Sequence, residues 1–305
     1  MITYDALAAH PPTFLCFTGL YPEEFLGLLL DFDLAWHTYE LGQLLDSCPR
    51  GRRPGGGRKP KLLTIEAKLL FILLYIKLYP LQAVLGFLFG LSQPQANDWI
   101  HTLTPILRDA LSRGRVLPER EGSRLAAILA ATEELVVLLD GVERPKQRPT
   151  DPEQQRADYS GKKKGHRRKN VLVTTYTQRC VKYLSETVEG RRHDKPIADH
   201  SALTFPDDIT LVQDTGLQGY APPNVRVCQP KKKPKGQHLS SEEKVRNTLI
   251  AQLRIRVEHV IAGVKRSRIV KDLFRNTKAG YDDLVMEVAC GLHNFRAECR
   301  HWGSP

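Results

Sequence analysis

The amino-acid sequence predicts an α/β fold, in which a mixed sheet flanked by helices follows an all-α region. Two observations support this class. Between residues 134 and 228 the chain carries short apolar runs rich in β-branched residues, each long enough for one buried strand. Before residue 115 and after residue 240, its character is helical instead. Strands followed by long helices indicate a mixed α/β domain, which we place at residues 130–300.

The first part of the chain divides at a basic segment. Residues 48–61, CPRGRRPGGGRKPK, contain three consecutive glycines and six positive residues, a composition that is typical of a flexible linker. Before this linker, Pro22 to Leu45 has helical character with acidic residues in its first turn. We therefore expect an N-terminal helical segment at residues 1–47 and a new region from residue 62.

Residues 62–115 carry the pattern of a helix-turn-helix. A helix is expected from Thr64 to Leu78, and a short one from Leu81 to Phe89 that ends at Gly90. Ser92 is a favourable N-cap for a third helix. A short helix, a tight turn with glycine and a following helix are the parts of a DNA-binding helix-turn-helix.

The third helix of this region begins with three amide side chains, Gln93, Gln95 and Asn97. Amides of this kind bond the edges of bases in the major groove. Helical hairpins with polar starts are also common without DNA, and Trp99 is as well suited to a core as to a contact. Base reading by this helix and a purely structural hairpin therefore both remain open.

The charge of the chain points to a polyanionic partner. Lys and Arg number 45 against 34 Asp and Glu, which gives a formal net charge of +11 and a pI of about 9.4. A well-solvated basic surface would have the same balance, but here the positive charge is clustered. Six of the nine residues at 161–169 are Lys or Arg: Lys162, Lys163, Lys164, Arg167, Arg168 and Lys169. Lys231, Lys232 and Lys233 form a second cluster.

The cysteines and the apolar runs favour a cytoplasmic, nucleoid-associated protein. Six cysteines without CxxC spacing indicate neither a zinc site nor a disulfide scaffold. The N-terminus lacks a signal-like apolar core. The most apolar stretch, Leu69 to Ile76, is far shorter than the roughly 20 residues that span a bilayer. We expect no membrane partner.

Two aspartates follow predicted strands. Asp140 ends the run VVLL and Asp214 ends ITLVQ, and a glycine follows each of them closely. A carboxylate at the end of a buried strand is held rigidly, while its head group reaches the edge of the sheet. Such aspartates also commonly cap turns, so neither position identifies a site by itself.

Glu258 lies on a helix whose apolar stripe can be read from Leu249, Leu253, Val257, Val260 and Val264. On the helical wheel, Arg254, Glu258 and Lys265 fall together on one flank of that stripe. One helix can thus bury its stripe against a sheet and offer a carboxylate between two cations. The alternative is an exposed ion pair between Arg254 and Glu258, which are four residues apart.

Two aspartates and a helical glutamate are the ligands that a two-metal phosphoryl-transfer site requires. Mg²⁺ and Mn²⁺ take oxygen ligands. Two such ions, about 3.5–4 Å apart, activate the attacking oxygen and stabilise the leaving one. The sequence contains no phosphate-binding loop, dinucleotide fingerprint or nucleophile elbow that would point to a competing site.

At these residues the sequence resembles the DDE transposases of bacterial insertion sequences, most closely the IS5-like group. The matching blocks are LLDGVERP around Asp140, YSGKKKGHRRKN at 159–170, GRRHDK at 190–195, LVQDTGLQGY at 211–220, KKKPKGQHLSSEEKVRNTLIAQLRIRVEHVIAGVKR at 231–266 and LHNFR at 292–296. They follow one another in the family's order over most of residues 134–296. Residues 64–113 resemble, more weakly, the helix-turn-helix that precedes the catalytic domain in relatives.

The resemblance implies an RNase H-like fold and a catalytic triad of Asp140, Asp214 and Glu258, which would ligate two Mg²⁺ or Mn²⁺ ions. The family's signature around its glutamate places Arg254 and Lys265 beside DNA phosphates. Its tyrosine position is Ala251 here, so no role is carried over from that tyrosine. The activity implied is cleavage of DNA at transposon ends and strand transfer into target DNA.

The partners implied are double-stranded DNA, both the terminal inverted repeats and the target, and a second copy of the chain in a synaptic complex of at least two protomers. Two alternatives remain: a catalytically inactive or domesticated DNA-binding protein, and a nuclease that cuts without joining.

Overall fold

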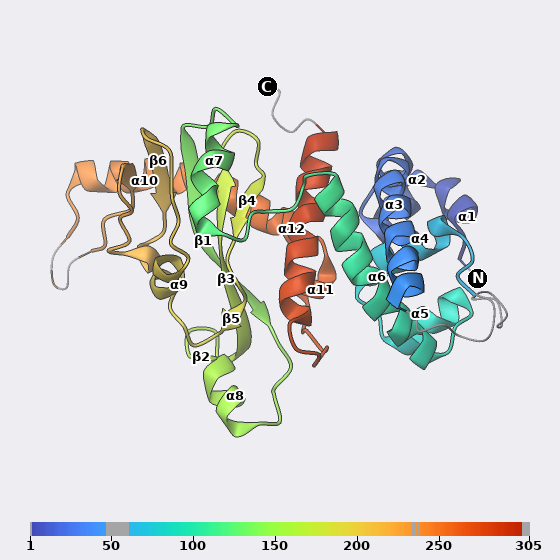
Figure 1. Ribbon diagram of the computed structural model, residues 1–305. Helices are drawn as coiled ribbons and strands as arrows, with labels where there is room; N and C mark the ends of the chain where they lie inside the picture. Colours follow the sequence, from blue (N-terminus) through green and yellow to red (C-terminus); the bar gives the residue numbers. More distant parts are fainter. Residues whose placement is uncertain (1, 47–60, 234–235, 237, 301–305) are drawn as a thin grey trace. The chain divides into compact units, whose positions relative to one another are not determined.

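The computed structural model describes residues 2–46, 61–233, 236 and 238–300 (Figure 1). All but the last residue of the expected linker at 48–61 lies outside these residues. The chain forms two compact units that interleave along the sequence. The helical unit contains Met1–Leu117, Arg266–Ile269 and Leu284–Cys299, and the sheet unit contains Pro118–Lys265 and Val270–Asp283. The domain bounds expected from the sequence, 1–47, 62–115 and 130–300, stay predictions.

The helical unit has a core of large apolar side chains, among them Phe14, Phe25, Phe32 and Phe71, each fully buried. Its helices are α1 (Tyr4–Ala8), α2 (Pro11–Thr18), α3 (Pro22–Asp46), α4 (Ile65–Leu78), α5 (Gln82–Phe89), α6 (Gln93–Arg113) and residues 284–299 of α12 (Tyr281–Cys299). The ring of Trp99 lies 6.0 Å from that of Trp36, tilted by 37°, and Trp36 is 8% exposed, so Trp99 contributes to the packing of this unit.

The turn between α5 and α6 confirms the helix-turn-helix. Gly90 ends α5 in the left-handed conformation with φ of 69°, which glycine adopts at little cost. Ser92 then begins α6 with a capping box, in which its side chain accepts from Gln95 and its backbone donates to the Gln95 side chain. Gly86 allows the close approach, since a Cβ atom there would lie 2.7 Å from the Leu91 carbonyl oxygen.

By length and composition, no single described helix could cross a membrane. Taken together, α2 and the Pro22–Leu45 part of α3 would pass that test as a pair bent by 48°.

The sheet unit is built on a mixed sheet of seven strands. Their order is β2-β3-β1-β6-β7, with β4 and β5 also paired to β3. The strands are β1 (Val136–Pro145), β2 (Tyr159–Ser160), β3 (Gly165–Thr175), β4 (Val181–Leu184), β5 (Val188–Glu189), β6 (Ile209–Gln213) and β7 (Val225–Cys228). The helical elements are η1 (Gly122–Arg124), α7 (Leu125–Ala130), α8 (Pro152–Asp158), α9 (Asp194–His200), η2 (Thr215–Leu217), α10 (Ser241–Val264) and α11 (Arg268–Lys271), the last shared between the two units. This mixed sheet with flanking helices confirms the predicted fold class.

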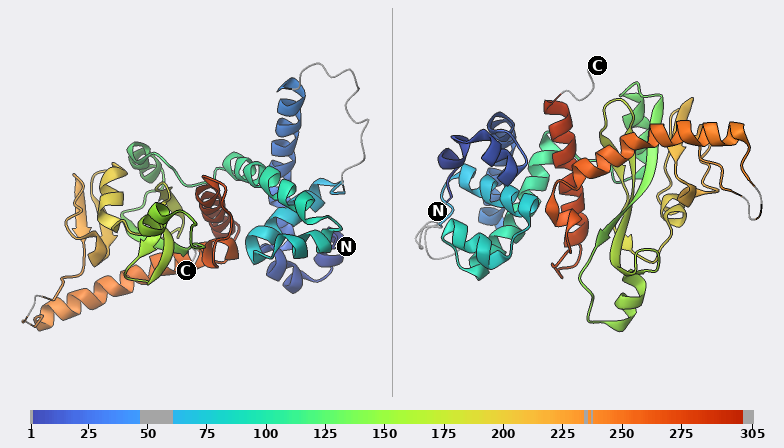
Figure 2. Two further views of the ribbon diagram at one scale, coloured as in Figure 1. Left: turned by 90° about the horizontal axis from the view of Figure 1, so that it is seen from below. Right: turned by 180° about the vertical axis from the view of Figure 1, so that it is seen from behind.

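Alternation along the strands assigns each side chain to one face of the sheet. Val137 and Leu139 of β1 belong to the buried cluster that includes Ile197 and Ala198 of α9. The alternate positions, Asp140 among them, therefore point to the opposite face. The long helix α10 contacts β1 and β6 and crosses the strands when the molecule is seen from behind (Figure 2).

Two strands are longer than the sequence indicated. Asp140 was expected to end its strand, but β1 continues to Pro145, because it stays paired with β3 after β6 has ended. The basic cluster at 161–169 also enters the sheet, because its residues from Gly165 onward lie within β3. Charged side chains are tolerated there because they form ion pairs between β1 and β3, such as Lys169 with Glu143 at 3.1 Å.

The turn between β3 and β4 depends on Glu134, whose side chain is buried. Its carboxylate accepts hydrogen bonds from the backbone N–H of Thr177 at 3.1 Å and of Gln178 at 3.0 Å. Replacing Glu134 with alanine leaves both donors without this acceptor, so we expect the free energy of unfolding to fall by about 2–3 kcal/mol. Urea denaturation measures this change. The control is Glu133→Ala, which removes an exposed neighbour; equal losses in the two variants would contradict the role of Glu134.

Candidate active site

Asp140 and Asp214 lie side by side because of the parallel pairing of β1 and β6. Leu139 and Gln213 are the last partners in that ladder, so the two aspartates occupy the next position on each strand and point to the same face. Arg254 of α10 binds both. Its Nη2 lies 3.7 Å from Oδ2 of Asp140, and its Nη1 lies 3.2 Å from Oδ1 of Asp214. One guanidinium thus bridges the two carboxylates.

Backbone groups fix the orientation of each carboxylate. The N–H of Gly141 donates to Oδ1 of Asp140 at 2.9 Å, and the N–H of Thr215 donates to Oδ1 of Asp214 at 2.7 Å. Asp214 is also the N-cap of η2. Asp214 therefore caps a turn, as strand-end aspartates commonly do. It also shares the Arg254 guanidinium with Asp140.

The two aspartates differ in exposure and in electrostatics. The side chain of Asp140 is 17% exposed, against 38% for Asp214. Burial raises the pKa of Asp140 to about 6, against the opposing effects of Arg254 and of the Gly141 N–H. The negative charges of Asp214 and Asp194 add to the rise. The raised pKa of Asp140 is therefore mainly a consequence of burial, which Arg254 offsets only in part.

Asp194 is a third carboxylate at this position, to which the sequence reasoning assigned no role. It is the first residue of α9, and a Cβ atom on Gly141 would lie 2.7 Å from its carboxyl carbon. A Cβ on Gly216 would lie 3.4 Å from its Oδ2. Lys169 holds it with Nζ 3.5 Å from Oδ1. Gly141 thus makes room for Asp194, while Gly216 lies in ordinary contact with it. In the sequence, Gly141 and the block at 190–195 were the signals that could have pointed to Asp194.

Glu258 lies one turn after Arg254 on α10, with an exposed side chain. Within the described residues, no group of three or more His, Cys, Asp or Glu side chains is close enough to hold a metal ion together. The structure brings together Asp140, Asp214 and Arg254, whereas Glu258 belongs to no group of three potential metal ligands among the described residues.

The apolar stripe predicted for α10 is correct only for its second half. Val257, Val260 and Val264 are buried, but Leu249 is 57% exposed. In the first half of the helix, Ile250 is buried instead. The sheet ends before the helix does, so the early turns of α10 have no strand to cover their apolar side.

Three of the predicted DNA-binding cations lie on β3 and at the end of α10: Arg167, Arg168 and Lys265. Arg167 approaches Glu143 at 4.0 Å, and Arg168 pairs with Asp158 at 3.4 Å and with Asp282 at 3.0 Å. Burial lowers the pKa of Lys265, as do Arg167 and Arg144 nearby. In contrast, Lys162, Lys163 and Lys164 form an exposed turn between β2 and β3.

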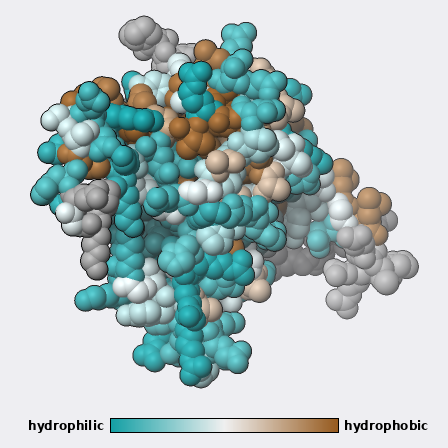
Figure 3. All heavy atoms as spheres, turned by 90° about the vertical axis from the view of Figure 1, so that its left-hand side faces the viewer, coloured by the Kyte–Doolittle hydropathy of each residue, from teal (hydrophilic) through white to brown (hydrophobic). Residues whose placement is uncertain are grey.

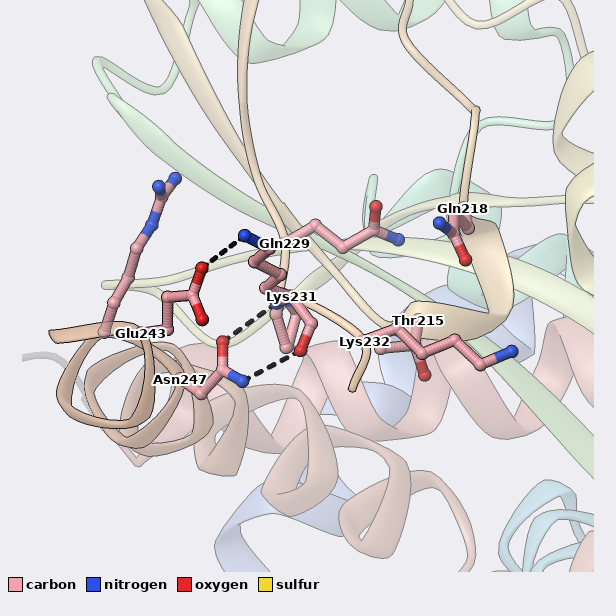
Figure 4. Close-up of a pocket in the computed structure, with 9 residues that line it drawn as sticks. Thr215, Gln218, Gln229, Lys231, Lys232, Glu243 and Asn247 are labelled. Atoms are coloured by element: carbon pink, nitrogen blue, oxygen red, sulfur yellow. Dashed lines mark hydrogen bonds and ion pairs between the residues drawn. The ribbon is translucent and has the colours of Figure 1, made fainter. Parts of the chain in front are cut away.

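A polar pocket with a volume of about 490 Å³ opens next to Asp214, between η2, the segment after β7 and the first turns of α10 (Figure 4). Lys231 and Lys232 line it, and Lys231 pairs with Glu243. Asn247 ties the segment to α10, accepting from the Lys231 N–H at 2.8 Å and donating to its carbonyl oxygen at 3.0 Å. Lys233 follows as an exposed residue.

The amides at the start of α6 are engaged within the helix-turn-helix. Gln95 closes the capping box with Ser92. Asn97 accepts from Gln82 at 2.9 Å, and Gln93 donates to Gln82 at 3.4 Å. Gln93 and Gln95 are nevertheless exposed. Their role in base reading stays a prediction.

The donor set of the acidic site fits a hard divalent cation. Asp140 and Asp214, which one guanidinium bridges, offer carboxylate oxygens, the ligands that Mg²⁺ and Mn²⁺ prefer. A cationic guanidinium already lies between Asp140 and Asp214, so this position accommodates positive charge.

Comparisons with known proteins agree with this geometry. The family described as DDE superfamily endonuclease matches residues 139–294, just over half of the chain. The family described as helix-turn-helix of DDE superfamily endonuclease matches residues 60–113. A probable transposase for insertion sequence element IS702 of Microchaete diplosiphon is 29% identical over 239 residues, which is 78% of this chain and 83% of that protein. No solved structure gives a significant match.

Proposed function

The chain belongs to the DDE superfamily endonucleases, which generally use divalent metals, and on this premise we propose that it is a transposase. It cleaves DNA at the ends of an insertion sequence and joins the freed 3′ ends to target DNA. The observation that carries this proposal is the pair of aspartates on adjacent parallel strands, bridged by a cation from α10. The helix-turn-helix and the similarity to a probable transposase support DNA ends as the substrate.

Asp140, Asp214 and Glu258 would hold two divalent ions, Mg²⁺ or Mn²⁺. When bound, such ions activate the attacking oxygen and stabilise the leaving oxygen of a phosphodiester. Since the pKa of Asp140 is about 6, its carboxylate is mostly ionised at neutral pH and available as a ligand. Gly141 and Thr215 keep both carboxylates oriented through their N–H groups.

Arg254 and Lys265 would supply the positive charge that faces the DNA backbone. The Arg254 guanidinium reaches two separate carboxylates with its two Nη atoms, and the same fork of donors can bind the two anionic oxygens of a phosphodiester. Lys265 lies near Arg167 and Arg144, so the end of α10 is a strongly positive region. Such a region favours a polyanionic substrate and neutralises charge that develops on phosphate oxygens.

A strand-transfer assay with end-labelled DNA and Mn²⁺ tests this function. A joined product is expected for the wild-type protein. Cleavage without joining would mean a nuclease, and DNA binding without cleavage would mean a binding protein. Asp140→Ala should abolish both cleavage and joining while DNA binding is retained; cleavage by that variant would contradict the assignment of the site. Because transposition brings two DNA ends together, we expect the active complex to contain at least two protomers.

The exposed lysines between β2 and β3 are expected to contribute to the salt dependence of DNA affinity. Each phosphate contact adds about 0.9 to the slope of log affinity against log salt concentration. Replacing Lys162, Lys163 and Lys164 together with alanine should lower that slope by roughly 2–3. Fluorescence anisotropy with duplex DNA measures it. The control is Arg124→Ala, an exposed cation on η1 that pairs with Glu121 at 2.9 Å. An unchanged slope in the triple variant would show that this turn does not contact DNA.

A further inference from the structure

A second pocket opens on the sheet unit at the end of the β2–β3 ribbon, with a volume of about 810 Å³. Its lining comes from the segment after β1, from α8, from the ribbon and from the segment before α9. The polar and aromatic residues that line it are Arg148, Gln155, Arg156, Tyr159, His166 and Arg191. The proposed cleavage and joining of DNA assigns no role to these residues.

Three arginines line this pocket, and no acidic residue is among the described residues of its lining. Arg148 is oriented by a neutral group, since its Nε and Nη2 donate to the side-chain oxygen of Gln155 at 3.0 and 2.8 Å. Gln155 is held in turn by the carbonyl of Pro149 at 2.8 Å. Like charges that converge without a carboxylate in the lining repel one another, so the pocket is suited to an anion with several charges.

An exposed aromatic ring forms part of the same pocket. Tyr159 is 44% exposed, whereas Tyr183 and Tyr220 are 2% and 6% exposed and serve as packing residues. Tyr159 and His166 are direct partners in the β2–β3 ladder, and their rings meet edge to face at 5.7 Å. The ring is thus held by the sheet while one side remains accessible. Rings presented in this way serve as platforms on which nucleic-acid bases stack.

The pocket is separate from the acidic site. On β3, Leu172 is the partner of Asp140, and His166 lies six residues away on the same strand. At about 3.4 Å per residue the two positions are roughly 20 Å apart, the length of about six base pairs. The exposed Lys162, Lys163 and Lys164 adjoin the pocket in the turn of this ribbon. Figure 3 shows that the lower end of the displayed face, toward α8, is mostly hydrophilic.

We propose that this pocket binds a single unpaired nucleotide of DNA, with the base on the Tyr159 ring and the adjoining phosphates on Arg148, Arg156 and Arg191. A ring can stack on a base face only where the neighbouring base has moved away, and a base that has left the duplex exposes its face in this way. This inference rests on the proposed function in one respect, that DNA is the substrate. It adds a contact about six base pairs from the cleaved bond.

Binding of the single strand dT12 and of a 12-base-pair duplex, each measured by fluorescence anisotropy, tests the pocket. Loss of one base–aromatic stack should weaken binding of dT12 to Tyr159→Leu by between about 5-fold and 150-fold. Tyr159→Phe should bind dT12 as the wild type does, and the affinity of both variants for the duplex should be unchanged. Arg156→Gln should weaken binding of dT12 and lower its salt dependence.

The matched control is Tyr21→Leu, which removes a tyrosine of similar exposure, 42%, from the helical unit. Equal dT12 affinities for wild type and Tyr159→Leu would overturn the proposal, as would equal losses in the leucine and phenylalanine variants. Thermal unfolding of each variant shows whether a loss comes from the fold. If the protein cleaves and joins DNA but Tyr159→Leu leaves dT12 affinity unchanged, the proposed nucleotide pocket alone is refuted. A Tyr159-dependent affinity without cleavage refutes the proposed function alone.

Discussion

Replacing Asp140 with asparagine is expected to abolish DNA cleavage and to stabilise the fold at pH 8. The two effects have one cause. Burial and the neighbouring Asp214 and Asp194 raise the pKa of Asp140 to about 6 in the folded protein, from an ordinary value of 3.8. The folded state therefore disfavours the ionised carboxylate that the chemistry needs, and a neutral amide removes both the penalty and the ligand.

The pH dependence of this stabilisation follows from the sign of the shift. A carboxyl group with a raised pKa in the folded state destabilises the fold progressively as pH rises from about 4 to about 6, and by a constant amount above that range. A shift of about two units corresponds to about 3 kcal/mol. The side chain is only 17% exposed, so screening by solvent reduces this figure little.

Thermal unfolding of Asp140→Asn at pH 8 and at pH 4, without divalent metal, measures the effect. We expect a higher midpoint than wild type at pH 8 and no difference at pH 4. Asp207→Asn serves as the control, because it removes an exposed carboxylate. A variant that is less stable than wild type at pH 8 would contradict the electrostatic account of Asp140.

Replacing Arg254 with glutamine is expected to have the opposite effect on stability. Its guanidinium bridges Asp140 and Asp214, so its loss leaves two neighbouring carboxylates to repel each other. Loss of one partner of a buried pair typically lowers stability by several kcal/mol. Asp214 is 38% exposed and partly screened by solvent, so we expect a loss of about 2 kcal/mol at pH 8.

Divalent metal should then stabilise the Arg254→Gln variant more than the wild type, because the cation replaces the missing positive charge between the aspartates. Thermal unfolding with and without Mn²⁺ measures this difference. Arg246→Gln, which removes an exposed cation from the same helix, should behave like the wild type in both conditions. The same response to Mn²⁺ in Arg254→Gln and wild type would indicate that the ion binds elsewhere.

Several elements could be predicted because their signals are local. Gly90 and Ser92 determine the turn of the helix-turn-helix through a left-handed cap and a capping box. Ser240 begins α10 with a second capping box, closed by Glu243. The run ITLVQ forms β6 as expected, and the parallel ladder then places Asp214 next to Asp140.

The features that sequence reasoning missed depend on contacts between distant segments. Asp194 reaches the site only because α9 begins beside Gly141, and no spacing along the chain reports that approach. The length of β1 depends on its pairing with β3, where ion pairs such as Lys169 with Glu143 offset the loss of apolar character. Leu249 has the right helical position but lies beyond the strands that bury the rest of the stripe.

We propose that Glu258 joins Asp140 and Asp214 in one metal site, although its side chain lies exposed one turn beyond Arg254. A titration of Mn²⁺ followed by electron paramagnetic resonance tests this claim without relying on activity. Loss of a ligand should weaken Mn²⁺ binding at least about tenfold in Glu258→Gln, as in Asp140→Asn. Glu242→Gln, on an exposed residue in the first turn of the same helix, should bind Mn²⁺ like the wild type. Wild-type Mn²⁺ affinity in Glu258→Gln would contradict the three-carboxylate site.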